Sequence, residues 1–230
     1  GGGNMFKSKN KIDKKVKYGK LKIYISISVL LSTLIFIIVF KTNYFTISEI
    51  IIKNNEKLSR DDIIAYSGIK VENNIFQIKL SQVEKKLQKN PYIKEAKVSR
   101  SIPDKIIIEI TERRKLAAIY YTGIYFIIDD EGYVLEAKSD LDDVVIVDGF
   151  EIDSFVEGKK INLNANEDLT KVLNLCKLLQ KSSIDINPKI SYNNGNINLV
   201  INKKLKVKFG NGENIDYKFR TFITIFQYLK

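Results

Sequence analysis

The stretch NPYIKEAKVSRSIPDKIIIEITER, residues 90–113, contains two alternating segments separated by a turn. Small or apolar residues alternate with polar ones over residues 95–99, and isoleucine occupies every second position over residues 106–110. Such alternation is typical of strands that bury one face of a sheet. The intervening Ser-Ile-Pro-Asp at 101–104 is typical of a turn. The stretch therefore predicts two strands joined by a short connection.

Two short helices are predicted before these strands. Residues 59–62 (SRDD) and 81–84 (SQVE) fit the capping box, in which a serine and an acidic residue three positions later bond each other's backbone N–H groups. Gly68 is expected to cap the end of the first helix, and Pro91 requires the second helix to end by Asn90. The side chains expected to face the core are Ile63, Ile64, Leu80, Val83 and Leu87.

A segment rich in Ile and Thr, residues 45–53, predicts a strand ahead of the helices. Asn54 and Asn55 follow it and favour a turn, because Asn tolerates positive φ better than any residue except Gly. The order over residues 45–113 is thus β-α-α-β-β. We expect an α+β fold, in which a three-stranded sheet carries two helices on one face.

Residues 114–230 predict a mixed β-sheet domain with flanking helices. Alternating apolar residues and Asn- or Gly-containing turns mark the strands, and a 3.6-residue apolar period marks the helices. The strands are expected at residues 116–121, 125–129, 133–136, 144–147, 190–192, 196–201 and 205–209, and one helix at 166–181. The last helix is expected to bury Ile215, Phe219, Phe222, Phe226 and Leu229.

Residues 23–40, IYISISVLLSTLIFIIVF, contain no charge, no Pro and no Gly. As a helix they extend about 27 Å, close to the hydrocarbon thickness of a bilayer. Tyr24 at one end and Tyr44 and Phe45 past the other are typical interfacial aromatic residues. A buried helix of a soluble domain is the alternative, but the apolar residues cover every face instead of one stripe. We therefore predict a transmembrane helix.

The basic charge of the chain is concentrated before this helix. Residues 1–22 hold eight lysines and a single acid, Asp13, so they supply +7 of the formal net charge of +11. The positive-inside rule then predicts a cytoplasmic N-terminus and extracytoplasmic residues from about 42 onward. The lysines are expected to contact anionic lipid. A cleaved signal peptide is disfavoured, because the apolar run is long and no small-x-small site follows it. Gly1–Asn4, before Met5, is interpreted as a cloning scar or upstream read-through.

These features resemble the FtsQ/DivIB family of bacterial cell-division proteins. The resemblance covers a basic cytoplasmic tail (1–22), a transmembrane helix (23–40), a POTRA domain (45–113) and a β domain (114–230). Its matching pieces are FTISEIII at 45–52, LSRDDI at 58–63, SGI at 67–69, NIFQI at 74–78, NPYIKEAKVSR at 90–100, Pro103, IIIEI at 106–110 and ER at 112–113. The family has a further strand after a helix like the last one here, and this sequence stops at Lys230, so we expect the β domain to lack its terminal strand.

The sequence favours no catalytic chemistry. It has no His, which rules out His-containing triads and HExxH zinc sites, and a single Cys, which rules out an internal disulfide. Cys176 is expected to be a core residue. Ser8–Lys11 fits S-x-x-K but lies in a tail expected to be disordered. A pair of carboxylates for glycan hydrolysis, distant in sequence, stays open.

Two further motifs are interpreted as turns. Asp129-Asp130-Glu131 is expected to be a solvated hairpin turn and not a metal or acid–base site. Gly210 and Gly212 are expected to lie in a loop that does not cradle phosphate. No catalytic, cofactor-binding or metal-binding residue is predicted, no cofactor is expected, and the partner-binding residues stay unassigned.

The resemblance implies a bitopic, single-pass type II membrane scaffold at the division septum. It would dock FtsL-like and FtsB/DivIC-like coiled-coil partners by strand addition and help to control septal peptidoglycan synthesis. A membrane-anchored cell-wall enzyme and a POTRA-type transport or chaperone module are the alternatives. Neither a small-molecule substrate nor a nucleic acid is expected as a partner, and binding of nucleic acid by the basic tail ranks last.

Overall fold

The computed structural model describes residues 3–140, 143–164, 168–182, 188–202 and 204–228, with side chains from Tyr18 onward. The chain divides into two compact units. Unit 1 comprises Gly1–Ile51, Ile69–Leu80 and Val98–Ile108, and unit 2 comprises Ile52–Gly68, Ser81–Lys97 and Glu109–Lys230. The mixed architecture of helices and sheets confirms the predicted α+β class.

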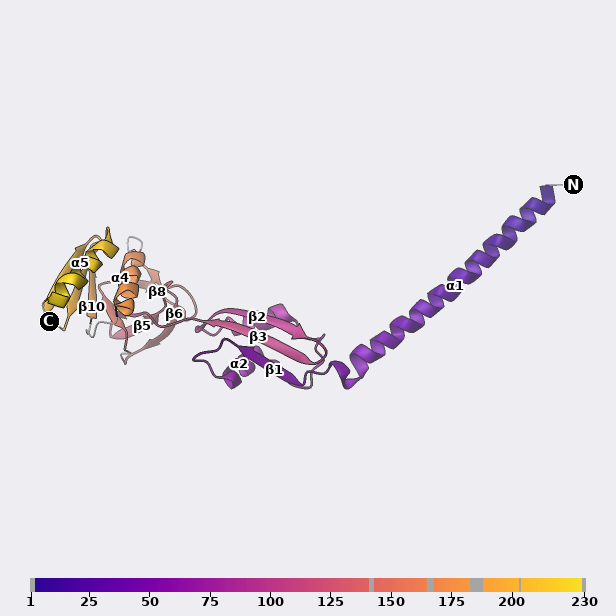
Figure 1. The fold of residues 1–230 in the computed structure, drawn as a ribbon, viewed down its shortest axis with the longest axis horizontal. Coiled ribbons are helices and arrows are strands. Elements are labelled where there is room, and N and C mark those ends of the chain that lie inside the picture. Colours follow the sequence, from indigo (N-terminus) through magenta and orange to yellow (C-terminus); the bar gives the residue numbers. More distant parts are fainter. Residues whose placement is uncertain (1–2, 141–142, 165–167, 183–187, 203, 229–230) are drawn as a thin grey trace. The chain divides into compact units, whose positions relative to one another are not determined.

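The N-terminal helix α1 runs over Gly3–Lys41 without interruption (Figure 1). Its segment Tyr18–Lys41 is long and apolar enough to cross a membrane, and none of its most apolar window is buried within the protein. The predicted span at 23–40 lies inside this segment. The tail expected to be disordered is helical as well, because residues 3–22 contain no Pro and are rich in Lys, a good helix former.

A three-stranded sheet follows, with strands β1 (Glu49–Lys53), β2 (Ile93–Ser101) and β3 (Lys105–Glu112) in the order β1-β3-β2. The helices are α2 (Arg60–Ser67) and α3 (Leu80–Leu87). The predicted order β-α-α-β-β is confirmed, but the first strand begins at Glu49 and not at residue 45, because residues Asn43–Phe45 form a 3-10 turn.

Local backbone signals fix the ends of α2. The Ser59 hydroxyl accepts a hydrogen bond from the backbone N–H of Asp62, and Gly68 adopts a left-handed φ of 67° at the other end. Asn54 turns the chain with a φ of 63°. The prediction that residues 81–84 form a second capping box was wrong. Helix α3 begins at Leu80, so Ser81 lies within its first turn instead of preceding it.

Unit 2 contains a seven-stranded sheet in the order β12-β11-β10-β7-β4-β5-β6. Strand β7 is parallel to both β4 and β10, and the other paired neighbours are antiparallel. The strands are β4 (Ala117–Tyr121), β5 (Ile124–Ile128), β6 (Val134–Lys138), β7 (Val145–Asp148), β10 (Pro188–Asn193), β11 (Asn196–Ile201) and β12 (Leu205–Gly210). A two-stranded sheet of β8 (Ile152–Ser154) and β9 (Asn162–Leu163) was not predicted.

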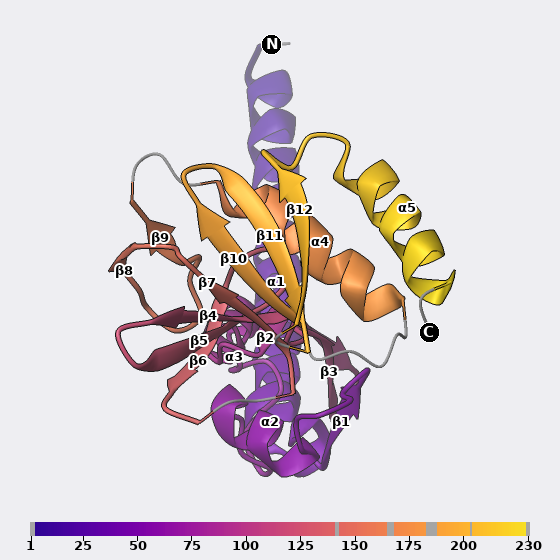
Figure 2. The ribbon, with the colours of Figure 1, turned by 90° about the vertical axis from the view of Figure 1, so that its left-hand side faces the viewer.

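Two helices, α4 (Leu169–Lys181) and α5 (Ile215–Tyr228), lie side by side along this sheet (Figure 2). Each buries the apolar stripe that its sequence predicts, and Cys176 in α4 is fully buried in the same core. Ile215, Phe219 and Phe222 are buried and Phe226 is partly buried, whereas Leu229 lies outside the described residues. The start of the predicted helix at 166–167 also falls outside the described residues.

Candidate functional site

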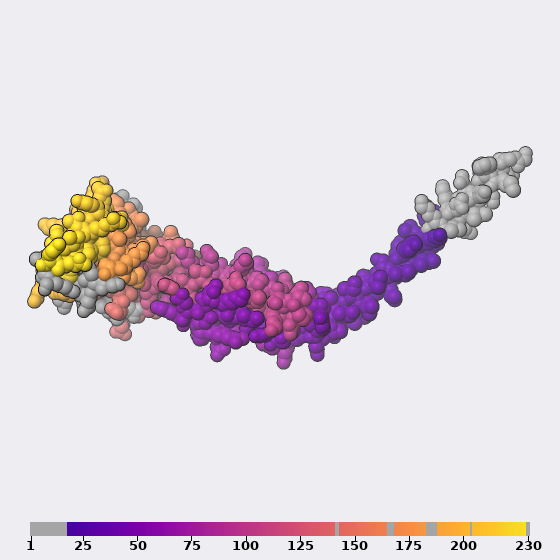
Figure 3. All heavy atoms as spheres, viewed as in Figure 1, coloured from indigo at the N-terminus to yellow at the C-terminus, as the bar shows by residue number. Residues whose placement is uncertain are grey.

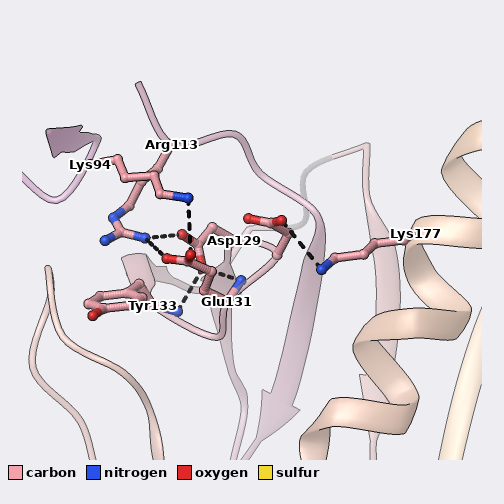
Figure 4. Close-up of polar contacts among 7 residues, drawn as sticks. Lys94, Arg113, Asp129, Glu131, Tyr133 and Lys177 are labelled. Carbon is pink, nitrogen blue, oxygen red and sulfur yellow. Dashed lines mark hydrogen bonds and ion pairs between the residues drawn. The ribbon is translucent and has the colours of Figure 1, made fainter. Parts of the chain in front are cut away.

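A cluster of charged side chains surrounds Arg113, directly after β3 (Figure 4). The backbone N–H of Arg113 donates to the carbonyl of Tyr92 at 2.8 Å, which fixes the start of its side chain. The guanidinium Nη1 donates to Asp129 Oδ2 and, at 3.0 Å, to Glu131 Oε2. Its carbon lies 3.6 Å from the centre of the Tyr133 ring, within cation–π range. Arg113 therefore contacts three side chains in and beside the turn between β5 and β6.

Asp129 is the buried anion of this cluster. Its Oδ1 accepts the backbone N–H groups of Glu131 at 2.9 Å and Tyr133 at 2.8 Å, so the carboxylate bridges the turn and Arg113. The prediction of a solvated turn was therefore wrong for Asp129, which is only 1% exposed. Its partner lies 16 residues earlier, and no local pattern in the turn reports such a cation.

Electrostatics in the outer part of the cluster follow from these contacts. Hydrogen bonds from Lys94, at 3.0 Å, and from Arg113 lower the pKa of Glu131. Burial by itself would lower the pKa of Arg113, but hydrogen bonds to Asp129 and Glu131 outweigh it and raise that pKa. Two cations thus face two carboxylates that already accept hydrogen bonds, which is the arrangement of a structural clamp.

Glu112, the neighbour of Arg113, has a separate role. Its carboxylate accepts the backbone N–H groups of Glu56 at 2.9 Å, Lys57 at 2.9 Å and Leu58 at 3.1 Å. Three successive N–H groups that converge on an anion form a strong binding site, here occupied by a side chain of the same chain. The Glu-Arg pair that ends the predicted POTRA domain thus anchors two different loops.

A pocket of about 340 Å³ beside this anchor brings two carboxylates together, those of Glu56 and Glu112. Glu56 pairs with Arg114 at 2.7 Å, and Glu112 holds the backbone of residues 56–58. Both carboxylates therefore stabilise the loop at 56–58, Glu56 from within the loop and Glu112 from the end of β3. This pocket brings together two carboxylates that are distant in sequence, as the open alternative of a carboxylate pair for glycan hydrolysis requires.

The two ends of the seven-stranded sheet differ. The outer edge of β6 is covered by the segment at 158–161: Val134 N–H donates to Lys159 O at 2.9 Å, and Gly158 N–H donates to Val134 O at 2.8 Å. Strand β12 is paired with β11 on one side, and no described strand pairs with its other side. Unpaired backbone groups at such an edge are a template for another strand.

An apolar groove of about 450 Å³ lies between β12 and α5. Leu205, Tyr217 and Ile225 line it and are exposed. The C-terminal segment that contains α5, yellow in Figure 3, reaches the surface of the molecule. The exposed lysines Lys206 and Lys208 also line this groove. The edge thus combines free backbone, an apolar surface and positive charge.

The remaining motifs are structural where the structure describes them. Burial raises the pKa of the Cys176 thiol to about 12, so it is not a nucleophile. The loop prediction was wrong for Gly210, which ends β12 and pairs with Ile197, because the strand extends one residue past Phe209. Gly212 lies in the β12–α5 turn with a φ of 74°, and a Cβ there would lie 2.9 Å from the side chains of Ile197 and Lys171. No group of three or more His, Cys, Asp or Glu residues that could hold a metal occurs among the described residues. The Ser8–Lys11 side chains lie outside them.

Comparisons with known proteins agree with this architecture. Residues 45–113 match the FtsQ-type POTRA domain. The chain is 32% identical over 204 residues to the cell division protein DivIB of Clostridium tetani, an alignment that covers 86% of this chain and 76% of that relative. The chain belongs to the FtsQ/DivIB family. As a member of this family it is a cell-division protein, and its N-terminal apolar helix fits a membrane anchor.

Two further FtsQ/DivIB relatives show how the similarity extends. DivIB of Clostridium botulinum strain Hall is 28% identical over 232 residues, covering 94% of this chain and 84% of the relative. FtsQ of Syntrophotalea carbinolica is 30% identical over 136 residues, covering 58% of this chain and 48% of the relative.

Proposed function

We propose that this FtsQ/DivIB-family chain is a bitopic scaffold that docks its partners by strand addition at the β12 edge. The observation that supports the proposal is the unpaired side of β12 beside the apolar groove under α5. A strand placed about 4.8 Å from β12 would satisfy the free backbone groups, and main-chain hydrogen bonds would supply affinity.

The chemistry of the edge selects the incoming strand. Side chains of an added strand alternate between the two faces of the sheet. Those on the α5 side would contact Tyr217 and Ile225. Lys206 and Lys208 border the same groove, but along β12 they alternate with Val207 and Phe209, which pack against the core, so side chains on the opposite face would pass the two lysines. We therefore expect a partner segment with apolar residues at alternate positions and acidic residues between them.

The resemblance supplies the identity of the partners. FtsL-like and FtsB/DivIC-like bitopic coiled-coil proteins are the proposed partners, and the complex would help to control septal peptidoglycan synthesis. We further propose a cytoplasmic N-terminus, POTRA and β domains at 45–113 and 114–230 outside the membrane, a septal location and no catalytic activity. Depletion of the protein is then expected to give filamentous cells.

Co-purification tests the docking edge. The full chain in detergent is incubated with the candidate partners from the same organism, once as it stands and once with a strand-forming extension after residue 230. Ile225→Glu places a charge in the groove and is expected to abolish capture, whereas Ile124→Glu, at an exposed apolar position on β5, should leave it unchanged. Equal capture by both variants would contradict docking at β12.

A further inference from the structure

The exposed apolar residues of unit 1 outside α1 are not scattered. Among the described residues they are Tyr44 (64% exposed), Val71 (51%), Phe76 (38%) and Ile102 (62%). They belong to three segments that are distant in sequence: the exit of α1, the loop before α3 and the turn between β2 and β3. Hydrogen bonds connect the other two segments to residues 39–48, which contain the exit of α1.

The loop before α3 is joined to the chain where it leaves α1. Ile75 N–H donates to Phe45 O at 2.8 Å, and Ile47 N–H donates to Asn73 O at 2.9 Å. The Phe76 ring lies 5.1 Å from the Phe45 ring in an edge-on contact. This loop is therefore fixed against the exit segment by backbone bonds and by aromatic packing.

Asn74 fixes the position of this loop relative to the end of α1. Its side-chain amide donates to the carbonyl of Val39 at 2.6 Å, inside the candidate span Tyr18–Lys41. Val39 lies two residues before the end of that span, or about 3 Å along a helix axis. Carbonyls in the last turn of a helix lack a partner within the helix, so the amide also caps α1. Phe76 thus lies within two residues of a group at the level of the membrane interface.

The third segment is attached to the same exit. Ser48 N–H donates to Asp104 O at 2.9 Å, and its hydroxyl donates to Asp104 Oδ2 at 2.6 Å. This places the turn that carries Ile102 beside the start of β1. The Arg100 guanidinium donates to the carbonyls of Ile75 at 2.8 Å and Ile78 at 2.6 Å, and so connects this hairpin to the loop.

We propose that Tyr44, Val71, Phe76 and Ile102 form a lipid-contacting surface, through which unit 1 rests on the outer interface of the membrane. Aromatic and apolar side chains at the ends of a span gain most at that depth, where hydrocarbon and water meet. The exposed Lys41, Lys70 and Lys79 lie within three residues of Tyr44, Val71 and Phe76 in the sequence, and would reach the lipid phosphates. The inference rests on the proposed function in one respect, that α1 spans the membrane with residue 42 onward outside.

Tryptophan fluorescence tests this surface, because the chain contains no Trp and a single substitution reports alone. Full-length Phe76→Trp and Ile102→Trp variants are reconstituted into phosphatidylcholine–phosphatidylglycerol vesicles that contain brominated lipids. Phe36→Trp in α1 reports on the span, and Tyr120→Trp, an exposed position on β4, serves as the aqueous control. Ile102→Trp lies on an exposed turn and keeps the test valid if Phe76→Trp disturbs its loop.

The expected result is a loss of fluorescence for Phe76→Trp and Ile102→Trp with bromines near the headgroup end of the acyl chain, and an emission maximum blue-shifted from that of Tyr120→Trp. Quenching of Phe36→Trp by deep bromines alone, with both surface variants unquenched, would overturn the lipid surface while leaving the anchor intact. It would favour a protein on this surface instead. Absence of quenching for Phe36→Trp would overturn the span and the surface with it.

Discussion

Arg113 and Asp129 form an ion pair from which water is largely excluded, with side chains 9% and 1% exposed. Removal of water from two charges is costly, and their attraction offsets that cost only while both are present. Asp129 also accepts two backbone N–H groups of its own turn, so the pair couples the residue that follows β3 to the shape of the β5–β6 hairpin.

We expect Arg113→Ala to lower the free energy of unfolding by about 3–5 kcal/mol, because it leaves Asp129 charged, buried and unpaired. Urea unfolding of the full chain in detergent, followed by circular dichroism, measures the loss. The control is Arg114→Ala: the Arg114 side chain is 72% exposed and pairs with Glu56 at the surface, so its loss should cost at most about 1 kcal/mol. Equal losses in the two variants would show that burial does not strengthen the first pair.

We expect the free energy of unfolding to fall at acidic pH in part because of Glu131. Its pKa is lowered in the folded state by Lys94 and Arg113, so its charged form stabilises the fold above its ordinary value of 4.5. That contribution is lost as pH falls through the lower, folded pKa. Unfolding curves between pH 6 and pH 3 should show the native chain losing stability more steeply than Glu131→Gln. Parallel curves for the two proteins would remove Glu131 from the acid response.

Gly149 is predicted to tolerate no side chain. A Cβ at this position would lie 1.9 Å from the carbonyl oxygen of Tyr192, and its φ is 91°. Gly149→Ala should therefore cost more than about 2 kcal/mol, from overpacking and left-handed strain together. Gly123→Ala is the matched control, because Gly123 has a φ of 89° and nothing within 4 Å of its Cβ position, which isolates the backbone strain. A similar thermal shift in both variants would mean that the contact with Tyr192 is relieved by movement.

Cys176 should be inert in the folded protein. With a pKa of about 12 and full burial, its thiolate is inaccessible and makes up roughly one part in ten thousand at pH 8. We expect a thiol reagent to label the chain only after urea unfolding. A Cys176→Ala/Tyr228→Cys variant provides an exposed thiol that should react at once. Rapid labelling of native Cys176 would reveal opening of the core around α4.

Local patterns in the sequence predicted the local parts of this fold. The Ser59 cap, the left-handed Gly68 and the Asn54 turn each depend on a few neighbouring residues, and all three are confirmed. The apolar stripes of α4 and α5 were also predicted, because a helix repeats its buried face every 3.6 residues. The predicted N-cap at Ser81 was wrong, because a capping pattern fixes a helix boundary only to within one or two residues.

The sequence by itself determined the apolar span, the order of most strands and helices, and the buried position of Cys176, because charge, hydrophobic period and turn residues act within one or two turns of chain. Only the tertiary structure decided which distant groups meet: Arg113 with Asp129, Glu112 with the backbone at 56–58, and Asn74 with Val39. It also decided that β12 lies at the end of its sheet. A hydrogen bond or ion pair between remote residues leaves no periodic signal, since its partners are brought together by the packing of whole elements and not by their spacing along the chain.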